Sequence, residues 1–147
     1  MYDTKLLIQI LPCSDNDFLL VKKFINEFAL DNTNLKREQF LLAKFNNELV
    51  GFVRQKNYSG CSELCSLGVI ESYRLKGVGS KLVKAIIHQC KNPLYLVAII
   101  PKFFTPFGFN EIADYPNEIL NKLQYCQNSL GVPEPYVVMK LNKSIVH

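Results

Sequence analysis

The chain has 147 residues, which fits one folded domain and leaves no room for a second of ordinary size. Hydrophobic residues make up 48% of the chain and charged residues 20%, a balance typical of a packed core and not of a disordered segment. The net charge of +4 comes without a stripe of interleaved basic and aromatic residues, so we expect no nucleic-acid partner and instead attraction of a small anionic ligand.

The start of the sequence, its apolar runs and its cysteines predict the cellular compartment of the protein. Residues 1–12 lack the regions of a signal peptide, and no apolar run reaches the roughly 20 residues that span a bilayer, so we expect no membrane partner. The five cysteines are an odd number, and Cys61 and Cys65 have no second pair of ligands nearby. We therefore expect reduced thiols, no metal site and a cytoplasmic location.

The first half of the chain reads as strands around one helix. Ser14 followed by Asp17 is a capping-box pattern, which predicts a helix start. Asn46-Asn47 is a hairpin signal. The polar stretch 31–38 is a loop or a short helix. The predicted strands are residues 5–11, 40–46, 48–55 and, after a turn at 57–61, residues 61–70.

The second half begins with a long amphipathic helix after Gly79, which Asn92-Pro93 ends. The strand at 94–100 is reached by a crossover, so it should run parallel to the strand at 61–70. Pro116 is expected as the first residue of a last helix. Ile119, Leu120, Leu123 and Cys126 are expected to share one face of this helix. The other predicted elements are a short strand at 108–113, a loop at 131–135 and a final strand at 136–141.

These elements predict an α/β (α+β) fold. Its sheet is mixed and mostly antiparallel, with one parallel strand pair around the long helix. We expect a single domain over residues 1–147.

The segment between the 61–70 strand and the long helix predicts an anion site. Gly77 and Gly79 have no Cβ, so the backbone there can approach a ligand closely. The first amides of the helix are unpaired, and the positive end of the helix dipole reinforces them. Neither a P-loop nor a dinucleotide fingerprint fits, because the Gly-Ser-Lys order is wrong for the first and Leu82 stands where the second needs glycine. A turn that only needs flexibility is the alternative.

Arg74-Leu75-Lys76-Gly77-Val78-Gly79 resembles the acetyl-CoA signature of the Gcn5-related N-acetyltransferase superfamily, Gln/Arg-x-x-Gly-x-Gly/Ala. Leu67-Gly68-Val69 matches the usual end of the preceding strand, and residues 103–109 look like the family's aromatic-rich segment ending in Gly-Phe. The resemblance covers about residues 5–141 and implies the GNAT fold with a splayed parallel strand pair. Residues 62–69, 103–109 and the tail are also similar to amino-acid N-acetyltransferases of the N-acetylglutamate synthase type.

The resemblance implies acetyl-CoA as the cofactor. Amides of residues 75–80 would hold the pyrophosphate, and an amide at 67–69 would polarise the thioester carbonyl. Glu63 corresponds to the glutamate that serves several members as general base; a solvated carboxylate at a strand edge is the alternative. The expected cofactor-binding residues are Leu67, Gly68, Val69, Arg74, Leu75, Lys76, Gly77, Val78, Gly79, Ser80 and Phe104.

One departure concerns the acid that protonates the leaving thiolate. Many members use a tyrosine at the position that Phe104 occupies, and phenylalanine cannot donate a proton. Tyr115, Thr105 or water protonates the sulfur, or the thiolate leaves unaided.

The resemblance thus implies an acetyl-CoA-dependent N-acetyltransferase that acts by direct attack of a small-molecule amine, with an amino acid as one candidate acceptor. Acetylation of a protein lysine or N-terminus is an alternative, and an acyl-CoA-binding sensor without chemistry is another. We expect a monomer or a homodimer. Arg54 and Lys56 could bind a substrate carboxylate or could simply be solvated charges.

Overall fold

The computed structural model describes residues 7–130 and 135–142. The chain divides into two compact units, residues 1–54 with 66–88 and residues 55–65 with 89–147. Two strands, β3 (Glu48–Asn57) and β4 (Ser62–Val69), belong in part to each unit. The single domain over residues 1–147 stays a prediction.

The helices of the first unit begin at or close to the predicted positions. In α1 (Asp15–Glu27), the Oγ of Ser14 accepts a hydrogen bond from the Asp17 amide at 3.2 Å, as expected of an N-cap. Helix α2 (Val78–Gln89) begins within the glycine turn, slightly earlier than predicted, and buries Val78, Leu82, Val83 and Ile86.

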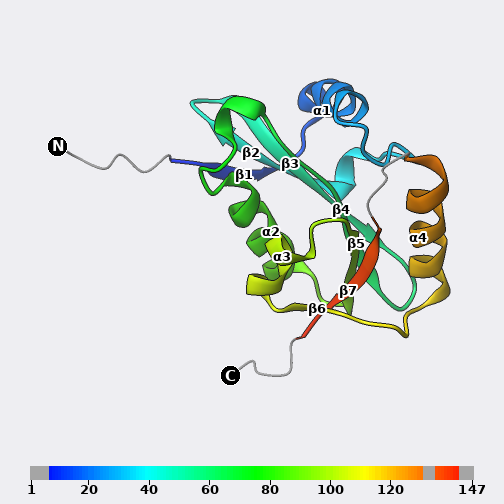
Figure 1. The fold of residues 1–147 in the computed structure, drawn as a ribbon. Helices are drawn as coiled ribbons and strands as arrows, with labels where there is room; N and C mark the ends of the chain where they lie inside the picture. The colour runs from blue at the N-terminus through cyan, green and yellow to red at the C-terminus, as the bar shows by residue number, and fades with distance from the viewer. Residues whose placement is uncertain (1–6, 131–134, 143–147) are drawn as a thin grey trace. The chain divides into compact units, whose positions relative to one another are not determined.

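The hairpin of the first unit is also as predicted. Asn46 and Asn47 join β2 (Phe40–Phe45) to β3 and have φ values of +49° and +65°, the left-handed conformation that a tight hairpin turn requires. Strand β1 (Gln9–Pro12) pairs antiparallel with β2 (Figure 1). It is shorter than the predicted strand at 5–11, of which residues 5 and 6 lie outside the described residues. The 31–38 stretch contains one turn of 3-10 helix at Arg37–Gln39. The core of this unit is Cys13, Val21, Ile25, Phe40, Leu42 and Phe52.

The second unit places a helix on a small sheet. Helix α4 (Asn117–Ser129) packs against β5 (Leu94–Ala98) and β7 (Val137–Leu141), as Figure 1 shows. Buried Cys61, Tyr95, Ile119 and Val138 form the core between them. The short helix α3 (Pro101–Phe104) and the strand β6 (Phe109–Glu111) connect β5 to α4.

Three details of the second unit differ from the prediction. Strand β5 ends at Ala98, because Ile99 and Ile100 are exposed and Pro101 begins α3. Pro116 is the N-cap of α4 and not its first helical residue, since its ψ of 158° is extended. Leu120 is 36% exposed, although the sequence predicts it on the same face as the buried Ile119 and Cys126, and Lys122 lies with those two on the buried face of α4.

The strands are hydrogen-bonded in the order β1-β2-β3-β4-β5-β7-β6. The only parallel pair that this sheet shows among the described residues is β4–β5, in which Ser62 faces Leu94 and Glu63 faces Tyr95. The predicted mixed, mostly antiparallel sheet with one parallel pair is therefore confirmed. No helix in residues 7–130 or 135–142 has the length and apolar character needed to cross a membrane.

Candidate functional site

The glycine turn lies in the first unit and leads directly into α2. The segment Arg74–Gly77 forms an exposed turn, and two of its residues, Leu75 and Gly77, have left-handed φ values of +64° and +83°. A Cβ added to Gly77 would meet nothing within 4 Å, so glycine serves the backbone conformation there and not close packing. Leu75 adopts a conformation that leucine disfavours, and its side chain is fully exposed.

Backbone amides at the start of α2 have no acceptor in residues 7–130 and 135–142. Within the described residues, the amides of Lys76 to Ser80 make no hydrogen bond, while the Lys81 amide begins the helical pattern by donating to the Gly77 carbonyl at 3.1 Å. These amides are therefore available to an anion, and the positive end of the helix dipole favours one. The described part of the chain therefore leaves the predicted anion site uncapped.

The end of β4 holds the turn in place. Arg74 Nε donates to the Val69 carbonyl at 2.9 Å, and the guanidinium lies over the Phe28 ring at 5.3 Å. Gly68 has no room for a side chain, because a Cβ would lie 2.5 Å from Cζ of Phe52. The predicted residues Leu67, Gly68 and Val69 thus pack in the same unit as the turn.

Glu63 lies in the second unit and is fully buried, so the solvated alternative for this residue is wrong. Lys122 Nζ approaches its Oε2 to 2.6 Å, although not at a good hydrogen-bonding angle, and both side chains are nearly inaccessible. The Tyr58 hydroxyl donates to Oε1 at 3.0 Å. Burial, and next the negative charge of Glu63, raise the pKa of Tyr58 well above its usual value of 10.0. This phenol therefore stays protonated and donates.

The sequence reading missed Lys122 and left Tyr58 without a role. A signal for Lys122 was present, because it lies three residues after Ile119 and four before Cys126, on one face of a helix. A lysine on an otherwise apolar helix face needs a buried counter-charge. Tyr58 could not have been assigned, because its contact with Glu63 depends on the shape of the turn at 57–61.

Phe104 is buried in an aromatic cluster of the second unit. Its ring centroid lies 5.0 Å from that of Phe103 and 6.0 Å from that of Phe109, both in edge-on geometry. The Thr105 hydroxyl donates to the Pro101 carbonyl at 3.0 Å. Phe104 is a packing residue in this arrangement, and the Thr105 proton is already engaged.

Arg54 is fully buried, so the solvated reading is wrong for it. Its guanidinium donates to Gln39 Oε1 at 2.8 Å and to the carbonyls of Thr33 and Asn34 at 2.7 and 2.9 Å. Arg54 therefore anchors the 31–38 loop to β3.

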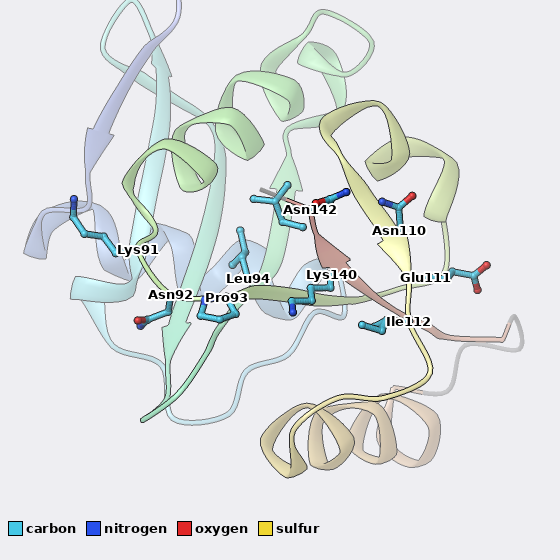
Figure 2. Close-up of a pocket in the computed structure, with 10 residues that line it drawn as sticks. Lys91, Asn92, Pro93, Leu94, Asn110, Glu111, Ile112, Lys140 and Asn142 are labelled. Atoms are coloured by element: carbon cyan, nitrogen blue, oxygen red, sulfur yellow. The ribbon is translucent and has the colours of Figure 1, made fainter. Parts of the chain in front are cut away.

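A pocket of about 520 Å³ opens in the second unit where β5 begins, beside β6 and β7. Figure 2 shows Lys91 and Glu111 pointing away from its middle, with Lys140 between Leu94 and Ile112. No predicted site residue lines this pocket, and its charged groups do not converge.

Comparisons with known proteins agree with this geometry. The model of the acetyltransferase (GNAT) family matches residues 8–109, whereas no curated protein matches the chain significantly. A solved structure of N-acetylglutamate synthase from Neisseria gonorrhoeae, in complex with coenzyme A and N-acetyl-glutamate, is 18% identical with a TM-score of 0.72. The alignment covers 95% of this chain but 36% of that one, so the chain spans about a third of that protein's length.

Two further structures match over nearly their whole length. Rv2747 from Mycobacterium tuberculosis, in complex with CoA, is 15% identical with a TM-score of 0.73, and the alignment covers 90% of this chain and 98% of that one. Naa50 from Arabidopsis thaliana, in complex with a bisubstrate analogue, is 19% identical with a TM-score of 0.65, covering 92% and 98%. These likenesses show the fold. Together with the match over residues 8–109, they establish that the chain belongs to the acetyltransferase (GNAT) family, whose members use acetyl-CoA.

Proposed function

We propose that the protein transfers the acetyl group of acetyl-CoA to a primary amine of a small molecule, by direct attack of that amine. The observation that carries this proposal is the row of unpaired amides from Lys76 to Ser80 at the start of α2. A diphosphate satisfies such amides and gains from the helix dipole. Lys76 and Arg74 add positive charge to the same turn.

Each group of residues has its own task in this proposal. The turn and the start of α2 hold the diphosphate, and an amide of the segment 67–69 polarises the carbonyl that the amine attacks. Acetyl-CoA supplies the activated thioester. Glu63 accepts the proton that the amine must lose, because an alkyl ammonium with a pKa near 10.4 is mostly protonated at neutral pH.

Two of the residues considered as the acid that protonates the leaving sulfur are unsuited to that role. Phe104 has no proton to give, and the Thr105 hydroxyl already donates to a backbone carbonyl. We therefore propose that water or Tyr115 protonates the thiolate, or that the thiolate leaves unaided.

An amino acid is the proposed acceptor. The support is the likeness to the synthase structure that holds N-acetyl-glutamate, together with the similarity of the sequence tail to that type of enzyme. The likeness to Naa50, crystallised with a peptide-based bisubstrate analogue, keeps a protein N-terminus as the second candidate. None of the five cysteines forms a disulfide, which supports a cytoplasmic location. We propose a monomer or a homodimer of single-domain chains.

The test is thiol release from acetyl-CoA with a panel of L-glutamate, L-lysine, other amino acids and a short peptide with a free N-terminus. We expect turnover with an amino acid. Turnover with the peptide alone would replace the small-molecule assignment with the second candidate. Binding of acetyl-CoA by calorimetry without turnover on any amine would favour the sensor alternative and contradict the proposed function.

A further inference from the structure

The second unit contains a closed cluster of three ionisable side chains from three elements. Glu63 comes from β4, Lys122 from the buried face of α4, and Tyr58 from the turn before β4. The turn is fixed by a hydrogen bond from the Tyr58 amide to the Cys61 carbonyl at 2.8 Å. A backbone hydrogen bond thus holds the turn that carries Tyr58.

The burial of Glu63 limits how it can serve as a base. The carboxylate has no exposed surface, Lys122 occupies the Oε2 side, and the Tyr58 hydroxyl occupies Oε1. A substrate amine cannot touch this carboxylate without displacing one of its partners. Tyr58, by contrast, is only partly buried, and its oxygen retains lone pairs that can accept a hydrogen bond while it donates to Glu63.

We propose that Tyr58 is a further catalytic residue that contacts the acceptor amine and relays its proton to Glu63, with Lys122 as the positioning residue of that base. This inference rests on the proposed function, since it takes Glu63 as the base. An ammonium proton passes to Tyr58 Oη as the phenol proton passes to Glu63 Oε1, so the tyrosine ends neutral. The free amine then forms the C–N bond, and the C–S bond breaks with its electron pair on sulfur. The second proton that the nitrogen must lose passes to water or to the departing thiolate.

Lys122 has a defined part in this arrangement. A carboxylate without solvent contact takes up a proton readily unless a cation offsets its charge. The ammonium 2.6 Å away supplies that cation and lies on the Oε2 side of the carboxylate. The tendency of Tyr58 to stay protonated, caused first by burial and then by Glu63, suits a relay that never forms a phenolate.

Titratable and charged side chains from several elements surround the cluster and influence how its activity should depend on pH. Tyr58 is influenced by Glu63 and Cys65 of β4 and by Lys122 of α4. From β5, Tyr95 faces Glu63, and Lys140 of β7 lies over the Tyr95 ring at 5.6 Å. Cys61 is influenced by Glu63 and Glu118. The cationic groups in this set are Lys122 and Lys140, of which Lys122 is the one in contact with Glu63.

The test compares Tyr58→Phe with Tyr95→Phe in the full chain. Both remove one tyrosine hydroxyl from the second unit. Tyr95 faces Glu63 in the strand register but has no hydrogen bond to the carboxylate. With L-glutamate or the best amine of the panel, we expect Tyr58→Phe to lower kcat about 100-fold, within the usual range for a proton-transfer group. Acetyl-CoA affinity should stay near that of the parent, and the melting temperature should fall modestly, because the buried Glu63 Oε1 loses its donor. Tyr95→Phe should retain kcat.

Lys122→Arg and Lys122→Met test the positioning role. The acidic limb of the kcat–pH profile should move to higher pH in Lys122→Met, because the uncompensated carboxylate becomes protonated more easily. Lys122→Arg keeps the charge and should keep the limb in place. A purely structural lysine would lower stability in Lys122→Met without moving the limb, which would overturn this role.

The failures are distinguishable. If the parent acetylates an amine and Glu63→Gln is inactive, but Tyr58→Phe is fully active, the relay is wrong and the proposed function stands. If Glu63→Gln is as active as the parent, Glu63 is not the base, and the relay falls with it. If the parent binds acetyl-CoA but acetylates no amine, both the relay and the proposed function are contradicted.

Discussion

Breaking the buried ion pair of Glu63 and Lys122 should destabilise the protein strongly. The two side chains are 0% and 7% exposed, and their charged atoms lie 2.6 Å apart. Lys122→Met removes the cation and leaves a carboxylate that water cannot reach. Loss of one partner of a buried pair costs about 3–5 kcal/mol. For a chain of this size, that corresponds to a fall in melting temperature of roughly 6–20 °C.

The assay is urea unfolding followed by circular dichroism, for Lys122→Met, Glu63→Gln and the double variant. The double variant should lose less stability than the sum of the single variants, with a coupling of about 0.5–3 kcal/mol, because it leaves no unpaired charge. The control is Lys23→Met. It breaks an exposed pair with Glu27, whose atoms are 3.9 Å apart, and should change stability by about 0–1 kcal/mol.

Two results would refute this reasoning. A loss below about 1 kcal/mol in Lys122→Met would mean that the carboxylate is solvated or already protonated in the folded protein. Single-variant effects that add up to that of the double variant, within about 0.5 kcal/mol, would mean that the two charges are not coupled.

Three other predictions concern the first unit. Gly68→Ala should destabilise the protein by about 1–3 kcal/mol in urea unfolding, because its Cβ would overlap the Phe52 ring; an unchanged midpoint would contradict this packing. Arg54→Met should cost roughly 3 kcal/mol and speed proteolysis within the 31–38 loop, which loses its anchor, and an equally resistant loop would count against that anchoring role. Lys44 lowers the pKa of Asp17 below its ordinary 3.8, so this pair should stabilise the protein above about pH 4 and less as pH falls through the lowered pKa. Lys44→Met should flatten this part of the stability–pH curve, and a curve unchanged from the parent's would refute the assignment.

Local signals explain why much of the fold could be predicted. Ser14 and Asp17 specify the start of α1 through one hydrogen bond, and Asn46-Asn47 tolerate the left-handed backbone of the hairpin. The parallel strand pair follows from the length of the crossover. The residue at which a strand or helix ends is harder to predict from the sequence. Ile99 and Ile100 are as apolar as the residues of β5 before them, yet they lie outside that strand.

The candidate site was predictable only in part. The glycine turn could be predicted, because Gly77 provides the φ of +83° that its backbone needs. Gly68, in β4 before the turn, is needed for close packing. The surroundings of Glu63 depend on residues far along the chain. Lys122 comes 59 residues later, and no local pattern relates the two, so the buried pair could only be found in the folded structure.

The central claim is that the amides at the start of α2 bind the diphosphate of coenzyme A, and calorimetric titration of acetyl-CoA tests it most directly. The comparison is between the parent, Gly79→Arg in the turn, and Gly60→Arg as the control. Gly60 lies in another exposed turn, where a Cβ meets nothing within 4 Å. We predict binding by the parent and by Gly60→Arg, and no detectable binding by Gly79→Arg. Equal affinity in all three proteins would contradict the claim.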